Sequence, residues 1–401
     1  MGALFPERDL IGIQMYDRGM WYKPYGSTGK MVSAIGFGGM RFPKVEASPA
    51  VYDYDACAGM LLEARDRGVT YFDTAPYYCD DQSELIFGHA MKDLKKGPGP
   101  LWVSTKSSEK EGPKLRAQLE KSLTRMGLPK VTFFHIWCIL NLDDYRSRLV
   151  PGGAYEAAKR AQAEGLIDHV VFSTHCNGAE IETIVDEGLF EGVTLGYNIL
   201  NFRFRQQGLV AAARKGLGVV TMNPLGGGVI PHRGEKLGFL KSSQDSTVID
   251  AALTFNANHE AISVVLAGMG NLDEVRQNCE VGRRLGVGAA LPGAETARAS
   301  FVEARKAELE LRTSDALDTL CTGCQYCLPC PQDIVIPKFM LAYNEKIFGE
   351  PKDALGMLKG HFGVPAGKAA DCVACGACEE RCTQHLPIIR RLAEIAEWAR
   401  S

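Results

Sequence analysis

The residues with the clearest chemistry are cysteines near the C-terminal end of the sequence. Of the 13 cysteines in the chain, eight fall into two runs, C-x2-C-x2-C-x2-C at 321–330 and C-x2-C-x2-C-x3-C at 372–382. Spacing this close lets three thiolates of one loop bind three irons of a cubane, while the fourth ligand comes from the other run. The runs predict two iron–sulfur clusters, with structural zinc sites or disulfides as the alternatives.

This part of the chain resembles the two-cluster bacterial ferredoxins. The resemblance implies two [4Fe–4S] clusters, each with three ligands from one run and the fourth from the other. One cluster would be bound by Cys321, Cys324, Cys327 and Cys382, and the other by Cys372, Cys375, Cys378 and Cys330. Two details depart from the ferredoxin pattern. Two residues instead of three separate Cys327 from Cys330, and Thr383 follows Cys382 where proline is usual. Such clusters can relay single electrons, and a purely structural role is the alternative.

A second group of candidate residues lies at the ends of two apolar runs. Asp73 ends the run that begins at Thr70, Tyr78 follows shortly after, and Lys106 ends the run that begins at Leu101. A nearby ammonium favours the phenolate and lowers a tyrosine pKa of about 10, while a carboxylate keeps the lysine charged and oriented. Each residue alone is more often a packed side chain, but together they predict an acid–base site centred on Tyr78.

The elements that must position these residues follow a repeated strand–helix pattern from Val32 to about Gly288. Eight short apolar runs, each followed by an amphipathic segment, predict an α/β fold of the (β/α)8 TIM-barrel class, with a doubly wound open sheet as the alternative. Catalytic residues of such barrels lie at the C-terminal ends of the strands. The expected strands begin at Val32, Thr70, Leu101, Val131, His169, Val193, Gly218 and Ile262.

The sequence also predicts the domain organisation. Residues 1–20 form an N-terminal extension, 21–294 form the barrel, and 295–401 form a small α-helical, ferredoxin-like domain. Residues 21–31 contain a glycine-bearing turn that predicts a hairpin at the bottom of the barrel. A helix is expected from about Lys338 to Ile347, just after Pro337.

Residues 21–288 resemble an aldo-keto reductase, and the whole chain resembles the iron–sulfur branch of that family. The resemblance implies that Asp73, Tyr78 and Lys106 are three members of a catalytic tetrad, in which Tyr78 exchanges a proton while a nicotinamide carries hydride. The segments that carry the resemblance are Gly29-Lys-Met-Val-Ser-Ala-Ile-Gly-Phe-Gly-Gly-Met, Phe72-Asp-Thr-Ala-Pro-Tyr-Tyr, Ser83-Glu, Ser104-Thr-Lys, Gly165-Leu-Ile-Asp-His-Val-Val-Phe-Ser-Thr-His, Tyr197-Asn and Pro224-Leu-Gly-Gly-Gly.

The fourth tetrad member, a histidine on the fourth strand, is where the chain departs from the family. Trp137 stands at that position, and His135 lies two residues earlier. Residues two apart on a strand share a face, so His135 would point inward one rung deeper, about 6–7 Å away. His135 is therefore a candidate catalytic residue, with a buried structural role as the alternative.

The family resemblance also implies a nicotinamide cofactor, NAD or NADP. Asn198 stands where the family binds the carboxamide, with Ser173 as a neighbouring partner, and Met222 replaces a frequent stacking aromatic. Glu274 stands where a cation usually holds a 2′-phosphate, so NAD is at least as probable as NADP, although Arg276 could still bind phosphate. The candidate cofactor-binding residues are Ser173, Asn198, Met222, Leu225, Gly268, Glu274 and Asn278.

The composition argues against several other classes of protein. The chain has 45 basic and 48 acidic residues, a formal charge of −3, which is unlike a nucleic-acid-binding surface. Its 46% hydrophobic and 23% charged residues are typical of a globular protein. No apolar run approaches the length of a membrane span, and residues 1–22 lack a signal-peptide pattern. A cytoplasmic protein is expected.

These patterns together predict an oxidoreductase that acts on a small carbonyl or alcohol substrate, sugar-like compounds included, with electron transfer to a redox protein partner. Nicotinamide carries hydride whereas a cubane carries one electron, so either a flavin in a partner mediates or the clusters serve another purpose. The alternatives are an electron-transfer or assembly subunit whose barrel has lost reductase activity, and a lyase or isomerase. Three further cysteines at strand ends and one histidine are expected to be small buried residues or a metal site: Cys79, Cys138, Cys176 and His175.

Overall fold

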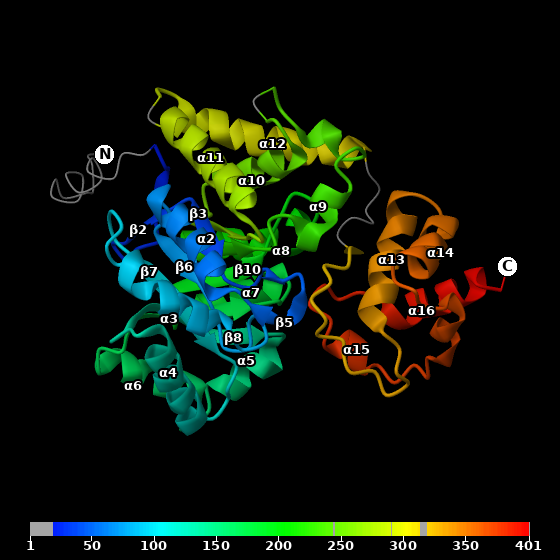
Figure 1. The fold of residues 1–401 in the computed structure, drawn as a ribbon, viewed down its shortest axis with the longest axis horizontal. Coiled ribbons are helices and arrows are strands. Elements are labelled where there is room, and N and C mark those ends of the chain that lie inside the picture. Colours follow the sequence, from blue (N-terminus) through cyan, green and yellow to red (C-terminus); the bar gives the residue numbers. More distant parts are fainter. Residues whose placement is uncertain (1–18, 244, 290, 313–318, 401) are drawn as a thin grey trace. The chain divides into compact units, whose positions relative to one another are not determined.

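The computed structural model describes residues 19–243, 245–289, 291–312 and 319–400, so almost all of the expected N-terminal extension lies outside the described residues (Figure 1). The chain divides into two compact units. Unit 1 comprises residues 1–197, 205–224 and 253–303, and unit 2 comprises residues 198–204, 225–252 and 304–401. The division therefore falls within one long helix, α12 (Ala294–Arg312), rather than before it.

A closed barrel of eight parallel strands forms the core of unit 1, as predicted (Figure 1). Pairing of the last strand with the first closes the barrel and rules out an open sheet. Around the barrel the strands are β3 (Ile35–Gly38), β6 (Tyr71–Asp73), β7 (Trp102–Ser107), β8 (Val131–Ile139), β9 (Ile167–Thr174), β10 (Gly192–Gly196), β11 (Gly218–Met222) and β12 (Val264–Gly268).

Helices connect the strands, and their ends follow ordinary capping rules. Asn177 and Glu180 form a capping box at the start of one helix, and Gly127 ends another in the left-handed conformation, with φ of 62°. The connecting helices are α2 (Tyr54–Asp66), α3 (Ser83–Leu94), α4 (Gly112–Met126), α5 (Leu142–Arg148), α6 (Ala154–Ala163), α7 (Gly178–Asp186), α8 (Phe202–Arg214), α9 (Val229–His232), α10 (Val248–Asn258) and α11 (Leu272–Ala289).

The bottom of the barrel is closed by the predicted hairpin, strands β1 (Tyr22–Pro24) and β2 (Met31–Ser33). Tyr25, which follows β1, is fully buried, and its ring packs against Tyr71 and Phe133. A Cβ at Gly218 would lie 2.1 Å from the Tyr25 ring, so this strand can start beside the ring only with glycine. A second hairpin, β4 (Lys44–Val45) and β5 (Ser48–Tyr52), follows the first barrel strand.

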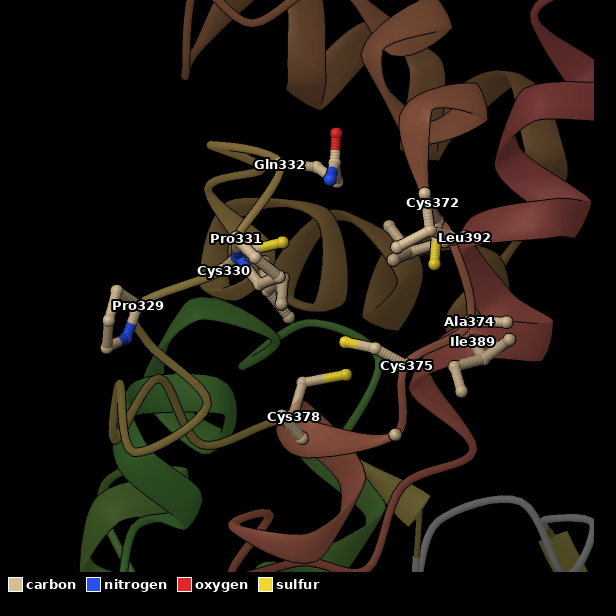
Figure 2. A pocket seen from close by; sticks show the side chains of 14 residues that line it. Pro329, Cys330, Pro331, Gln332, Cys372, Ala374, Cys375, Cys378, Ile389 and Leu392 are labelled. Carbon is tan, nitrogen blue, oxygen red and sulfur yellow. The ribbon is translucent and has the colours of Figure 1, made fainter.

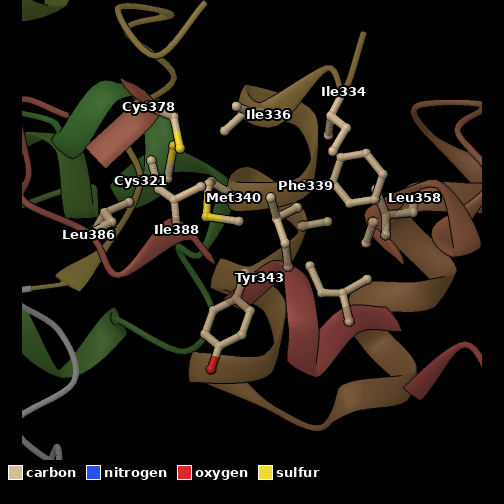
Figure 3. Close-up of a cluster of buried hydrophobic side chains, with 14 of the residues drawn as sticks. Cys321, Ile334, Ile336, Phe339, Met340, Tyr343, Leu358, Cys378, Leu386 and Ile388 are labelled. Atoms are coloured by element: carbon tan, nitrogen blue, oxygen red, sulfur yellow. The ribbon is translucent and has the colours of Figure 1, made fainter. Parts of the chain in front are cut away.

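The C-terminal part of unit 2 is a small helical domain with its own core (Figure 3). The helix predicted after Pro337 is present as α13 (Ile336–Phe348), and α14 (Pro351–Gly360), α15 (Ala377–Glu380) and α16 (Ile388–Trp398) follow. Cys321 and Cys378 belong to the same buried cluster as Phe339 and Met340. The cysteine runs are therefore held in a packed scaffold. No helix in the described ranges is long and apolar enough to cross a membrane.

Candidate active site and cluster sites

Three of the predicted catalytic side chains meet at the C-terminal ends of two neighbouring strands of unit 1. Lys106 donates to both carboxylate oxygens of Asp73, at 3.0 and 2.7 Å, and its Nζ lies 3.3 Å from the hydroxyl of Tyr78. Ser104 also donates to Asp73, although Ser104 was not among the predicted catalytic residues. Because β6 and β7 pair in register, Asp73 is bound to the lysine of the adjacent strand.

The charges of this group are set by burial and by mutual contact. Burial lowers the pKa of Lys106, but Asp73 and then Tyr78 more than offset this effect, so its pKa lies above the ordinary value. Burial raises the pKa of Tyr78, and the opposing charge of Lys106 only partly reduces that shift. The lysine is therefore charged and the tyrosine protonated at neutral pH. The expected net lowering of the tyrosine pKa is not observed, because desolvation is the larger effect.

Trp137 lies beside this group, at the position where the family resemblance led us to expect a histidine. Its ring meets the Tyr78 ring edge-on at 5.6 Å and stacks on the exposed Tyr77 ring at 6.3 Å. The register of β8 shifts between Ile136 and Ile139, and Cys138 has a φ of 63°. This bulge interrupts the alternation of side chains along the strand, as bulges near functional sites often do.

His135 lies deeper in the barrel interior and is fully buried. Its Cα pairs with that of Lys106, its Nε2 lies 2.9 Å from the Thr194 hydroxyl, and its Nδ1 lies 3.4 Å from the Thr105 carbonyl oxygen. Burial and then the charge of Lys106 lower its pKa to about 4, so the ring is neutral at physiological pH. These contacts favour the structural role that the sequence left open.

The candidate cofactor-binding residues are distributed over both units. In unit 1, Ser173 accepts from the Cys138 backbone N–H at 3.1 Å, Met222 ends β11 partly exposed, and Asn278 is buried on α11. In unit 2, the Asn198 side-chain oxygen accepts from the backbone of Leu200 and Asn201, which shapes the loop after β10. Leu225 begins the unit 2 segment that follows β11.

The segment from Gly268 to α11 has the geometry of a capped helix start. The Glu274 carboxylate accepts from the Gly270 backbone N–H at 2.7 Å and from the Asn271 amide at 3.1 Å. Arg276 donates to Glu63 at 2.9 Å and is therefore already paired. Arg41 was not identified from the sequence, but its side chain covers Gly268, since a Cβ there would lie 2.6 Å from its Cγ. An acidic group thus occupies the helix start.

Four cysteines of unit 2 line one small cavity (Figure 2). We call them the second cysteine set: Cys330, Cys372, Cys375 and Cys378. Figure 2 shows their sulfurs pointing into the cavity, whose other walls include Ile389 and Leu392. Nowhere in the described ranges do three His, Cys, Asp or Glu side chains converge on a single-ion site. Thiols spread around an apolar cavity fit a cubane better than one zinc ion.

The other four ligand candidates, the first cysteine set, are Cys321, Cys324, Cys327 and Cys382. Cys327 is close enough to Cys324 and Cys382 for their charges to act on its thiol. The Gly323 N–H donates to the Cys321 sulfur at 3.4 Å, and the Leu386 N–H donates to the Cys382 sulfur at 3.3 Å. Burial raises the pKa of Cys321 to about 12, so iron would bind there with loss of a proton. The crossed assignment of the eight cysteines to two clusters stays a prediction from the ferredoxin resemblance.

The scattered cysteines do not assemble into a site in the described residues. Cys176 is buried with its sulfur 3.8 Å from the Ile139 carbonyl oxygen, and Cys79 lies 3.5 Å from the Gly39 carbonyl oxygen. No metal-binding group of three or more donors is found in these ranges. Cys176 is buried as expected, whereas Cys79 and Cys138 are partly exposed.

Comparison with known proteins agrees with this geometry. The sequence model of the aldo/keto reductase family matches residues 34–285, and that of a 4Fe-4S dicluster domain matches residues 320–387. The chain is 29% identical over 281 residues to L-galactose dehydrogenase of Arabidopsis thaliana, covering 63% of this chain and 85% of the plant enzyme. It is 28% identical over 191 residues to aflatoxin B1 aldehyde reductase member 2 of Rattus norvegicus, covering 44% of this chain and 50% of the rat protein.

Solved structures share the barrel fold. The holo form of the aldo-keto reductase AKR11C1 from Bacillus halodurans superposes with a TM-score of 0.57 at 19% identity, covering 71% of this chain and 96% of that structure. At this identity the similarity concerns the fold alone.

Proposed function

Since the chain belongs to the aldo/keto reductase family and carries a 4Fe-4S dicluster domain, we propose that this oxidoreductase interconverts a small carbonyl compound and its alcohol in the barrel. We propose further that it exchanges single electrons with a redox protein through two clusters. The observation that supports the barrel reaction is the contact of Lys106 with both Asp73 and Tyr78.

Each side chain of this group has a defined task in carbonyl reduction. When bound, the nicotinamide supplies hydride to the carbonyl carbon. Tyr78 is protonated and donates its proton to the carbonyl oxygen, so that hydride and proton together give the alcohol. Lys106 stabilises the phenolate that remains, and Asp73 keeps Lys106 charged and oriented. In the reverse direction, the Tyr78 phenolate accepts the proton of the alcohol.

The aromatic wall next to Tyr78 suggests the class of substrate. Trp137 and Tyr77 present stacked rings in place of a polar histidine, so a substrate with a C–H-rich face fits this wall better than a strongly charged one. A sugar or polyol has such a face. The similarity to L-galactose dehydrogenase, an enzyme named for a sugar substrate, supports this choice.

Glu274 supports NAD as the dinucleotide. Its carboxylate lies at the start of α11, where a 2′-phosphate would meet a like charge, whereas a ribose hydroxyl could donate to it. Arg276, the alternative phosphate ligand, is bound to Glu63. The residues present therefore fit NAD better than NADP.

Contacts within unit 2 support a link between the clusters and the active-site loops. Phe204, in the first turn of α8 after β10, packs its ring 5.3 Å from His385, three residues after Cys382. Gly227, after β11, lies against Thr322, which follows Cys321. Loops that follow barrel strands carry the catalytic function of this fold. A flavin in the partner protein would connect the two reactions: it would accept hydride from released NADH and pass the two electrons one at a time to the clusters.

Gly227→Ala is expected to disturb the first cysteine set. A Cβ at this position would lie 2.3 Å from the Thr322 carbonyl oxygen, so the loop next to Cys321 must move. Gly226→Ala is the matched control, because its φ of 62° is close to the 67° of Gly227 but its nearest neighbour would lie 3.6 Å away. We expect the iron content to fall from about eight towards about four per chain only in the Gly227 variant. Equal iron contents in both variants would contradict the link.

The proposed function is tested on protein purified without oxygen. Iron and sulfide are counted, and NAD⁺, NADH, NADP⁺ and NADPH are titrated by calorimetry, followed by oxidation assays with polyols and aldoses. About eight irons and tighter binding of NAD than of NADP are expected. Full iron without dinucleotide binding would reject the barrel reaction. Trp137 beside Tyr78 would then indicate an electron-transfer subunit whose barrel has lost reductase activity.

A further inference from the structure

A buried arginine near the first cysteine set has two side-chain nitrogens without a hydrogen-bond partner among the described residues. Arg391, on α16, is only 2% exposed, and its Nε and Nη1 atoms have no partner in the part of the chain that the structure describes. Its guanidinium lies 4.5 Å from the centre of the Tyr343 ring. A guanidinium has five N–H donors and no acceptor, so burial without acceptors is unfavourable.

The surroundings of Arg391 indicate what would satisfy these donors. Its charge acts on the thiols of Cys321 and Cys382. Cys321 is fixed nearby, because its backbone N–H and C=O both bond to the side chain of Asn344, which follows Tyr343, at 2.9 Å. A cluster bound to four thiolates is negatively charged and rich in sulfur acceptors, so it is the acceptor that this buried cation requires.

A second unpartnered donor lies next to Cys321 in the first cysteine run. The Thr322 hydroxyl is buried without a hydrogen-bond partner among the described residues. The Cys324 sulfur lies 3.2 Å from the Thr383 hydroxyl. The ligand segments of the first cysteine set thus carry two hydroxyl groups, one without a partner and one beside a ligand sulfur.

The second cysteine set has a different environment. The acidic Glu379 follows Cys378, and its carboxylate accepts from the backbone N–H of Ile389, which lines the same cavity, at 2.8 Å. Lys368, whose charge interacts with Cys330, is partly exposed and paired with Asp371 at 2.7 Å. Hydrogen bonds and positive charge near a cluster favour its reduced, more negative state, and exposed or paired charges do so less.

We infer that Arg391 donates hydrogen bonds to the first cluster or its thiolates and thereby makes this cluster the more easily reduced of the two. The inference rests on the proposed clusters. It makes Arg391 a positioning and tuning residue for electron transfer, and it gives the two clusters an order. Electrons would collect on the first cluster, whose ligand segments pack against the loops after β10 and β11.

The test is a redox titration of the iron-loaded protein followed by electron paramagnetic resonance. In Arg391→Gln we expect the reduction equilibrium of one cluster to weaken about tenfold, the scale of one buried charged hydrogen bond. For a one-electron couple this corresponds to a shift of about 59 mV to lower potential. Arg391→Lys keeps the charge but not the planar set of donors, so a smaller shift in the same direction is expected.

Arg390→Gln is the matched control. It removes the same charge from the neighbouring position of the same helix, where Arg390 is exposed and 3.6 Å from Glu394. Both reduction steps are expected to match those of the original protein. Unchanged steps in an Arg391→Gln variant that retains all its iron would overturn the inference. If that variant loses iron, an unchanged titration of Arg391→Lys overturns it instead. Absence of two clusters from the original protein would refute the proposed function rather than the role of Arg391.

Discussion

Tyr78→Phe is expected to lower kcat for carbonyl reduction by about 10²–10⁴-fold, because the variant removes the only atom of Tyr78 that can exchange a proton with the substrate. The hydroxyl is the only group of this side chain with an exchangeable proton, and it lies 3.3 Å from the Lys106 ammonium. Dinucleotide affinity and iron content should stay the same, since phenylalanine preserves the ring that packs against Trp137. Steady-state kinetics with calorimetry and an iron count would check this prediction.

Tyr77→Phe provides the control for that experiment. Tyr77 is the adjacent tyrosine and also packs against Trp137, but its hydroxyl accepts from Gln118 at 3.3 Å and is not bound to Lys106. Its kcat should change by less than about threefold, because no proton transfer is assigned to it. If both variants lose activity equally, the loss is not specific to the Tyr78 hydroxyl and the acid–base assignment is not supported. If Tyr78→Phe remains fully active, the acid–base assignment is wrong.

The second large effect concerns the crossed ligation of the clusters. Cys330→Ala should lower the iron content from about eight to about four per chain, since one cubane loses a ligand. Combining it with Cys372→Ala should cause no further loss, because both residues line the same cavity. Combining it with Cys321→Ala should remove nearly all iron, because that residue belongs to the first cysteine set. Iron analysis and paramagnetic resonance of the reduced protein would check both double variants.

A pattern without crossing predicts the opposite result. Cys330→Ala with Cys321→Ala would then leave about four irons, and Cys330→Ala with Cys372→Ala would leave almost none. Cys57→Ala is the control, since Cys57 is buried on α2 of unit 1 and should leave the iron content unchanged. Loss of all iron in every single variant would mean that the domain needs both clusters to fold.

The sequence determined the parts of this protein that depend on local order. Repeated strand and helix periods predicted the closed barrel, and the hairpin before it was also expected. Asp73 and Lys106 could be placed together because they end consecutive strands, and consecutive strands of a (β/α)8 barrel are neighbours. The spacing of the cysteine runs predicted the dicluster domain for the same reason, since ligands within a run are a few residues apart.

Only the tertiary structure decided the features that join distant segments. His135 is partnered by Thr194, 59 residues away, and Arg276 by Glu63, 213 residues away, so neither role is visible in a local pattern. The bulge after Ile136 likewise breaks the strand period from which His135 was expected to share a face with Trp137. In the sequence, Arg391 is simply one of two adjacent arginines near the C-terminal end. It becomes a candidate for tuning a cluster because folding buries its donors beside two thiols without giving them an acceptor.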